Sequence, residues 1–250
     1  MARSKRMIYI ILGFLAASIV FVIAEALWIQ FNGQTIPRPE ISRASQTLGF
    51  GPSLRYVVMG DSTAVAQGGD YTKGYASATA AYLAQSHTVT WQNVAVSGER
   101  AGGVLTHQVS QAVKSKPDVV VIAVGANDVT HLTPISSVAS SLRKSIALLR
   151  QSNPGVRIIL TGSPDMGSVP RFGQPVRWLA GKRTQTLNTM VVELAKEQQV
   201  IFAPIAEKTG PTFRAHPELF AKDKFHPTTQ GYEVWIPVLI EALKKSGYNT

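Results

Sequence analysis

The chain has 250 residues, of which 45% are hydrophobic and 16% charged, no cysteine, and a formal net charge of +10. This length suffices for one large domain or at most two, and the composition excludes wholesale disorder. The absence of cysteine excludes disulfides, iron–sulfur clusters, cysteine-based zinc sites and a thiol nucleophile.

Residues 1–30 resemble a membrane anchor. Arg3, Lys5 and Arg6 precede the uncharged run MIYIILGFLAASIVFVIA at residues 7–24. This run is close to the lower limit of the roughly 17–25 residues that a transmembrane helix needs, and its basic flank places the N-terminus inside. We therefore predict an N-terminal transmembrane helix that contacts the membrane through residues 7–29. The chain is then a single-pass protein of the cell membrane with an extracytoplasmic catalytic domain. The alternative is a signal peptide cleaved near Ala26 and a secreted protein, because residues 24–26 have the small-x-small form of a cleavage site.

The segment after the anchor, residues 31–52, is polar and contains two internal prolines, Pro37 and Pro39. It is expected to be a linker, followed by one catalytic domain over residues 53–250. About +8 of the net charge lies beyond residue 30, but the basic residues are scattered. This distribution predicts no nucleic-acid partner.

Five short apolar runs predict strands: RYVVMG, TVTWQNVAV, DVVVIAVG, VRIILTG and VIFAPI. Helix-like segments alternate with them at residues 75–85, 105–115, 135–151 and 176–198, and residues 228–246 form a closing helix that Pro237 is expected to kink or interrupt. Such alternation predicts an α/β domain with a five-stranded parallel sheet covered on both faces. Ligands of such sheets bind at the carboxyl ends of the strands.

Polar residues follow three of these strands. Asp61 and Ser62 come directly after the first strand, Gly98 after the second, and Asn127 after the third. A later segment, FAKDKFHPTTQGY, carries Asp223 and His226. Taken singly, each of these is an ordinary turn, helix-cap or surface residue. Their occurrence together indicates acyl-transfer chemistry.

In that chemistry Ser62 is the nucleophile, His226 the general base, and Asp223 the group that orients the imidazole from three residues away. The oxyanion requires donors where its charge develops. The candidates are the backbone N–H groups of Ser62 and Gly98 and the side-chain amide of Asn127.

The sequence here resembles the SGNH hydrolases, also called the GDSL esterase/lipase family, over about residues 54–243. The motifs that carry the resemblance are Gly60-Asp61-Ser62, Gly98, the Gly-x-Asn-Asp at residues 125–128, and the Asp-x-x-His-Pro at residues 223–227. The resemblance implies a flavodoxin-like three-layer fold. It also implies a metal-free Ser–His–Asp hydrolase with the oxyanion hole Ser62, Gly98 and Asn127. Thr63 and Ala64 depart from the leucine or isoleucine that many members have after the serine.

The predicted function is a serine esterase that hydrolyses carboxylic esters outside the cytoplasmic membrane and needs neither metal nor cofactor. The substrate is a small ester, a lipid or an acylated glycan. The loop at residues 163–175, with Arg171 and nearby Arg177, is expected either to wall the site and favour an acidic substrate or to be plain surface. Two alternatives to the esterase are an acyltransferase with the same site and a catalytically silent binding module.

Overall fold

The computed structural model describes residues 2–32 and 34–249; residues 1, 33 and 250, which belong to the predicted anchor, linker and hydrolase domain, lie outside the described residues. Its sheet has six strands in the order β1-β3-β2-β4-β5-β6. The strands are β1 (Gln46–Leu48), β2 (Ser53–Gly60), β3 (Thr88–Asn93), β4 (Val119–Ala123), β5 (Arg157–Leu160) and β6 (Ile201–Phe202). The last five are the predicted strands, and they run parallel to one another.

The prediction of a five-stranded, purely parallel sheet is wrong, because β1 adds a sixth, antiparallel strand. It pairs with β3 in the register Gln46↔Trp91, Thr47↔Thr90 and Leu48↔Val89. All three β1 residues are exposed, so no buried face gives the segment a strand-like pattern. Pairing with the otherwise open edge of β3 makes it a strand, and this edge is visible only in the folded chain.

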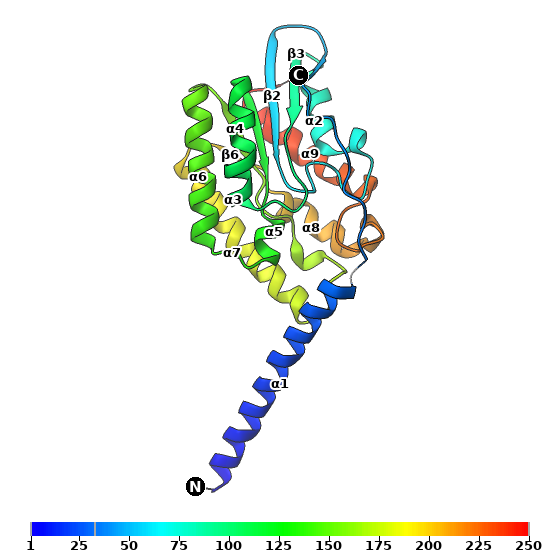
Figure 1. Ribbon diagram of the computed structural model, residues 1–250, viewed down its shortest axis with the longest axis vertical. Helices are drawn as coiled ribbons and strands as arrows, with labels where there is room; N and C mark the ends of the chain where they lie inside the picture. The colour runs from blue at the N-terminus through cyan, green and yellow to red at the C-terminus, as the bar shows by residue number, and fades with distance from the viewer. Residues whose placement is uncertain (1, 33, 250) are drawn as a thin grey trace.

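Two helical layers enclose the sheet, as Figure 1 shows. The first layer comprises α3 (Ala101–Gly103), the π-helical turn η2 (Val104–Gln108), α4 (Val109–Ala112), α6 (Ile135–Ser152) and α7 (Val176–Glu197). The second comprises α2 (Tyr75–Leu83), α8 (Ile205–Ala215) and α9 (Thr229–Lys245). Alternate residues of β2, β4 and β5 face the two layers; Val57 and Met59 of β2 contact the first, while Tyr56 and Val58 contact the second. The domain is therefore a three-layer α/β structure.

The helices match the expected segments with three differences. The segment predicted as one helix at residues 105–115 is divided into η2, α4 and the 3₁₀ turn η3 (Val113–Ser115). Helix α9 includes Pro237 without being divided there. Helix α8, which contains Pro211, falls in a stretch that the periodicity did not assign to a helix. The short elements η1 (Tyr71–Lys73), α5 (Ala126–Thr130), η4 (Met166–Ser168) and η5 (Pro217–Leu219) complete the chain.

The N-terminal helix α1 (Ala2–Asn32) projects away from the rest of the domain, and its C-terminal end approaches α7 (Figure 1). No helix among residues 2–32 and 34–249 has the length and apolarity that a membrane crossing requires. The predictions of a single-pass transmembrane helix, of membrane contact through residues 7–29 and of a cell-membrane location are therefore wrong. The uncharged run between Arg6 and Glu25 is close to the shortest length that can span a membrane, so its length alone is weak evidence for a transmembrane helix.

The strand order decides where a site forms. The chain begins the parallel sheet at the central strand β2, proceeds to β3 on one side, and then crosses to β4 on the other. The crevice beyond the carboxyl ends of β2 and β4 is therefore the point where the order reverses, and open α/β sheets bind ligands at such a point.

Candidate active site

The chain leaves the sheet in a tight turn directly after β2. The Asp61 N–H donates to the carbonyl of Ala123 at 3.1 Å, so the pairing of β2 with β4 extends one residue past Gly60. The Ser62 carbonyl then accepts from the N–H of Gln67 at 3.0 Å, which closes the turn. Ser62 is only 5% exposed. Its hydroxyl therefore lies at the reversal point of the strand order, in a largely enclosed position.

Asp61 supports this turn from inside the protein. Its Oδ1 accepts from the N–H of Thr63 at 2.9 Å and from the Thr63 hydroxyl at 2.8 Å. Burial raises the pKa of the Asp61 carboxyl to about 6, although the hydrogen bonds from Thr63 act in the opposite direction. Asp61 thus holds the turn with a side chain that is buried.

Two further side chains hold the loop that follows Ser62. The Asn93 amide at the end of β3 donates to the carbonyl of Ala64 at 2.8 Å, and the Tyr232 hydroxyl of α9 donates to the carbonyl of Gln67 at 2.8 Å. Asn93 and Tyr232 are both buried. Because these contacts come from different elements, the loop is fixed by tertiary structure rather than by its own sequence.

The residues predicted as a triad form one hydrogen-bonded chain. His226 Nε2 lies 2.9 Å from Ser62 Oγ, and His226 Nδ1 lies 2.6 Å from Asp223 Oδ2. Asp223 is 3% exposed. With Nδ1 donating to the carboxylate, Nε2 is the nitrogen that accepts the hydrogen bond from the Ser62 hydroxyl. The structure therefore brings together three side chains from two segments that lie 164 residues apart.

The Asp223–His226 pair lies in a turn rather than in a helix. The turn is closed by the N–H of Ala221, which donates to the carbonyl of His226 at 2.7 Å, and Lys224 adopts a left-handed φ of 55°. Burial would raise the pKa of Asp223, but hydrogen bonds from the ring and N–H of His226 and from the N–H of Phe225 lower it overall. The carboxylate consequently stays ionised at neutral pH and can hold the imidazole.

The three predicted oxyanion donors follow adjacent strands of the sheet. Gly98 follows β3, Ser62 follows β2, and Asn127 lies at the start of α5 after β4. Gly98 has a φ of +88°, a backbone conformation that residues other than glycine rarely adopt. The Asn127 amide donates to the carbonyl of Glu99 at 3.0 Å, which fixes its orientation and leaves its second hydrogen for another acceptor.

Gln108 of η2 is a residue that the sequence analysis missed. Its side chain accepts from the N–H of Gly60 at 2.8 Å and donates to the carbonyl of Gly60 at 2.8 Å, and it is fully buried. It therefore binds both backbone groups of the residue at which β2 ends. A signal was present, since Gln108 lies four residues from both Val104 and Ala112 on an otherwise apolar helical stripe.

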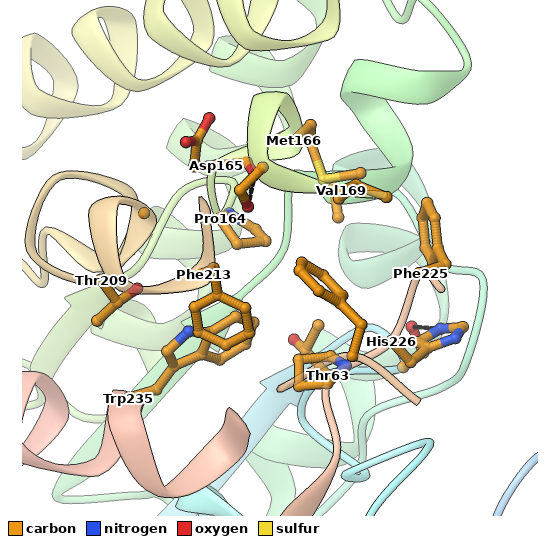
Figure 2. A pocket seen from close by; sticks show the side chains of 16 residues that line it. Thr63, Pro164, Asp165, Met166, Val169, Thr209, Phe213, Phe225, His226 and Trp235 are labelled. Atoms are coloured by element: carbon orange, nitrogen blue, oxygen red, sulfur yellow. Dashed lines mark hydrogen bonds between the residues drawn. The ribbon is translucent and has the colours of Figure 1, made fainter. Parts of the chain in front are cut away.

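A small apolar pocket of about 30 Å³ lies beside the serine and the histidine. Figure 2 shows Met166 and Val169 above it, Phe213 and Trp235 on one side, and Phe225 with His226 on the other. Ser62 and its neighbour Thr63 also line the pocket. The pocket can therefore receive a small apolar group next to the Ser62 hydroxyl.

A larger groove of about 640 Å³ lies on the other side of His226. Its lining includes Asn127 and His226 from the candidate site, Arg171 and Phe172 from the loop after β5, and Arg183 from α7. Phe225 and His226 line both the pocket and the groove, so these two residues separate them. An ester at Ser62 thus has space on two sides.

The loop at residues 163–175 forms part of both spaces, as the sequence led us to consider. Arg177, however, is hydrogen-bonded to the backbone of this loop and does not line either space. Its guanidinium donates to the carbonyl of Phe172 at 2.7 Å and to that of Pro170 at 3.1 Å. Among the residues that the structure describes, no group of three or more His, Asp or Glu side chains could hold a metal ion.

Comparisons with known proteins agree with this fold and site. The chain matches the GDSL-like Lipase/Acylhydrolase family over residues 58–234. It is 33% identical over 129 residues to the GDSL-like esterase Rv1075c of Mycobacterium tuberculosis (strain ATCC 25618 / H37Rv), a match that covers 51% of this chain and 40% of the relative. It is 27% identical over 201 residues to an arylesterase of Vibrio mimicus, which covers 78% of this chain and 88% of that protein. The solved structure of TesA has the same fold, with a TM-score of 0.63 and 20% identity over 77% of this chain and 99% of TesA.

The fold and the family match define a class, the carboxylic ester hydrolases of α/β architecture. Because the family match extends over most of the domain, the chain belongs to the GDSL-like lipase/acylhydrolase family. The resemblance inferred from the four sequence motifs is thereby confirmed. The chain spans less than half the length of the first of these two relatives.

Proposed function

We propose that this protein is a serine esterase in which Ser62, His226 and Asp223 act as the catalytic triad. The observation that carries the proposal is the continuous chain of hydrogen bonds, 2.9 Å from Ser62 Oγ to His226 Nε2 and 2.6 Å from His226 Nδ1 to Asp223 Oδ2. Serine is a weak nucleophile until a base removes its proton, and this arrangement supplies the base and its orienting carboxylate.

The reaction then follows from the roles of these groups. Ser62 Oγ attacks the ester carbonyl while His226 Nε2 takes the hydroxyl proton, and the same nitrogen returns that proton to the departing alcohol. Water, activated by His226 in turn, hydrolyses the acyl-enzyme. The ionised Asp223 stabilises the imidazolium that forms in each half of the reaction.

The oxyanion is stabilised by the backbone N–H groups of Ser62 and Gly98 and by the Asn127 amide. Support for this assignment comes from their places after three adjacent strands and from the fixed orientation of the Asn127 amide. Donors that are oriented before the reaction cost no reorganisation when the charge develops.

The substrate is an ester with at least one apolar half, as the lining of the pocket beside Ser62 requires. The two relatives are an esterase and an arylesterase, which supports aryl and alkyl esters as substrates of this chain as well. Lipid esters fit the apolar wall of the larger groove beside His226. An acylated glycan stays a prediction.

The experiment is hydrolysis of p-nitrophenyl esters from acetate to palmitate by the full chain. Ser62→Ala should reduce kcat at least about 10³-fold, and Asp223→Asn should reduce it by a similar order because the imidazole loses its tautomer control. Ser152→Ala at the C-terminal end of α6 is the matched control, since its hydroxyl donates only to the carbonyl of Leu149.

The preferred chain length would report how much apolar surface the site offers. Turnover by Ser62→Ala close to that of Ser152→Ala would contradict the proposal, as would a folded protein that hydrolyses none of the esters.

A further inference from the structure

The groove beside His226 combines an apolar wall with two cations. Val176 and Leu179 of α7 and Phe172 of the preceding loop line it, and Leu132 and Leu179 are 69% and 45% exposed. Arg171 and Arg183 line the same space. Apolar surface and fixed positive charge in one groove suit a molecule that is itself apolar along part of its length and negatively charged elsewhere.

Both arginines are held in place by their neighbours. The Arg171 guanidinium donates through Nη1 to the carbonyl of Gln34 at 3.1 Å and lies 5.9 Å from the centre of the Phe225 ring. The Arg183 guanidinium donates through Nη2 to the carbonyl of Thr133. The Thr133 carbonyl carries no net charge, so it does not neutralise Arg183. The two cations are therefore positioned before any substrate arrives.

Arg183 also has an unsatisfied donor. Its Nε is buried, and among the described residues it has no hydrogen-bond partner. A buried N–H without an acceptor is costly, and the cost is larger for a charged group. A small movement of the half-buried side chain toward an anionic oxygen in the groove would provide the missing acceptor.

The lining of the groove contains no acidic side chain within the part of the chain that the structure describes. The carboxylate of Glu25 from α1 lies against Gly173 of the same loop, but Glu25 does not line the groove. The site carboxylate, Asp223, is buried behind His226 and hydrogen-bonded to it. The charge that a ligand in the groove meets directly is therefore positive.

We infer that this groove selects esters that carry a carboxylate or a phosphate, with the anionic group at Arg171 and Arg183 and the apolar part along α7. This inference rests on the proposed esterase function of the same site, because it specifies the substrate of that reaction. The anionic group could belong to a phosphorylated glycerol or to a simple hydroxy acid, and the chemistry that the arginines recognise is common to both.

The test compares matched pairs of substrates on the full chain. One pair is octanoyl-glycerol 3-phosphate and octanoyl-glycerol; the other is the octanoyl ester of 4-hydroxybutanoate and that of its primary amide. We expect the anionic member of each pair to have a kcat/KM about tenfold higher or more, as one charge-assisted contact would give. A preference in the phosphate pair alone or in the carboxylate pair alone identifies the source of the anion and supports the inference.

Variants then assign the preference to the groove. Arg183→Gln and Arg171→Gln should each reduce the anionic-to-neutral ratio of kcat/KM several-fold, mainly through KM, and Arg183→Lys should restore part of it. Lys182→Gln is the control, because Lys182 is the exposed neighbour of Arg183 on α7, carries the same charge and does not line the groove.

Wild-type ratios near one in both pairs, with the neutral esters hydrolysed, would overturn this inference and leave the esterase proposal intact. Ratios that Arg183→Gln and Arg171→Gln change no more than Lys182→Gln does would also overturn it. Failure to hydrolyse any of the four esters, together with silence toward p-nitrophenyl esters, would instead refute the proposed function itself.

Discussion

At the scale of single residues, the position of the proposed nucleophile, Ser62, depends on a side chain that lines neither the pocket nor the groove. Gln108 binds both backbone groups of Gly60, while Val96 donates a further hydrogen bond to the Gly60 carbonyl at 3.1 Å. The Gly60 N–H therefore has Gln108 as its acceptor, two residues before Ser62. A buried amide at this place fixes the direction in which the chain leaves β2, and that direction decides where the serine hydroxyl lies.

We expect Gln108→Met to lower kcat for p-nitrophenyl esters about 10-fold to 100-fold with little change in KM, because a small displacement of Ser62 is costly and Gln108 lines neither pocket nor groove. The free energy of unfolding should fall by about 1–3 kcal/mol, since the Gly60 N–H is left buried without an acceptor. Steady-state kinetics and urea denaturation measure both effects.

The matched control is Gln111→Met. Gln111 lies three residues further along the same helical segment, is part-exposed, and donates only to the carbonyl of His107 at 2.9 Å. If Gln108→Met and Gln111→Met have the same kcat at a temperature where both are folded, Gln108 does not position the nucleophile.

At the scale of elements, the site lies at the ends of strands, and side-chain amides from the helices fix the backbone there by hydrogen bonds. Asn188 of α7 binds both backbone groups of Ser163, in the same way that Gln108 binds those of Gly60. Its side-chain amide accepts from the Ser163 N–H at 2.9 Å and donates to the Ser163 carbonyl at 2.8 Å. Both amides belong to the first helical layer, and each binds the backbone at or just beyond the end of a strand. The opposite edge of the sheet is organised by the turn between β1 and β2, where Gly49 has a φ of +74°.

Gly49→Ala should lower the free energy of unfolding by about 2 kcal/mol or more while kcat of the folded protein stays near that of wild type. A Cβ at position 49 would collide with the backbone oxygens of Ala84 and His87, which cannot move easily, and the left-handed φ adds strain. Thermal unfolding and ester hydrolysis at low temperature are the two measurements.

Gly102→Ala provides the comparison, because Gly102 lies in α3 and a Cβ there would come no closer than 4.0 Å to Ser141 Oγ. We expect it to be neutral or slightly stabilising. A Gly49→Ala protein as stable as Gly102→Ala would show that the β1–β2 connection does not need this conformation.

At the scale of the whole molecule, the centre of the domain contains two carboxyls that burial disfavours in their charged forms. Burial raises the pKa of Asp61 to about 6 and also raises the pKa of Asp128. Between about pH 4 and pH 6 the folded protein then binds more protons than the unfolded chain, so its stability falls as the pH rises. Asp118 and Asp223 have lowered pKa values. Their ionised forms stabilise the folded protein, and this contribution is lost only as the pH falls toward their lowered pKa values, at more acidic pH than the Asp61 effect.

Asp61→Asn should remove most of the decline across this window. For a shift of about two pKa units, the wild-type free energy of unfolding declines by about 3 kcal/mol on passing from pH 4 to above pH 6, and the asparagine variant should gain a comparable amount at pH 7.5. The substitution retains an oxygen to accept from the Thr63 N–H. Urea denaturation at several pH values is the measurement.

Asp70→Asn is a matched control, because Asp70 makes the same pair of hydrogen bonds to Thr72, at 2.9 Å from N–H and 2.7 Å from the hydroxyl, on the surface. The hydrogen bonds from Thr72 lower the pKa of Asp70, so its loss should leave the slope between pH 4 and pH 6 unchanged. Parallel pH profiles for wild type and Asp61→Asn would contradict this account.

The sequence by itself determined the α/β class, the five parallel strands and the family. Continuous apolar runs such as the one that forms β4 are typical of strands buried on both faces of a parallel sheet, and three of the four motifs follow a strand. The strand ends therefore marked Ser62, Gly98 and Asn127 as residues of one sheet edge, and the Asp223–His226 spacing marked a local pair. These inferences depend on local pattern, which a sequence displays directly.

Only the tertiary structure decided the features that depend on contacts between distant segments. The exposed β1 strand exists because β3 has a free edge, and Gln108 matters because it reaches the end of β2 from another layer. Arg183 rather than Arg177 lines the groove, because Arg177 is bound to the loop carbonyls beside it. The uncharged run before Glu25 predicted a membrane span that the described structure does not support. Pairing partners, burial and the direction of long side chains are set by the whole fold, so local residue patterns do not contain them.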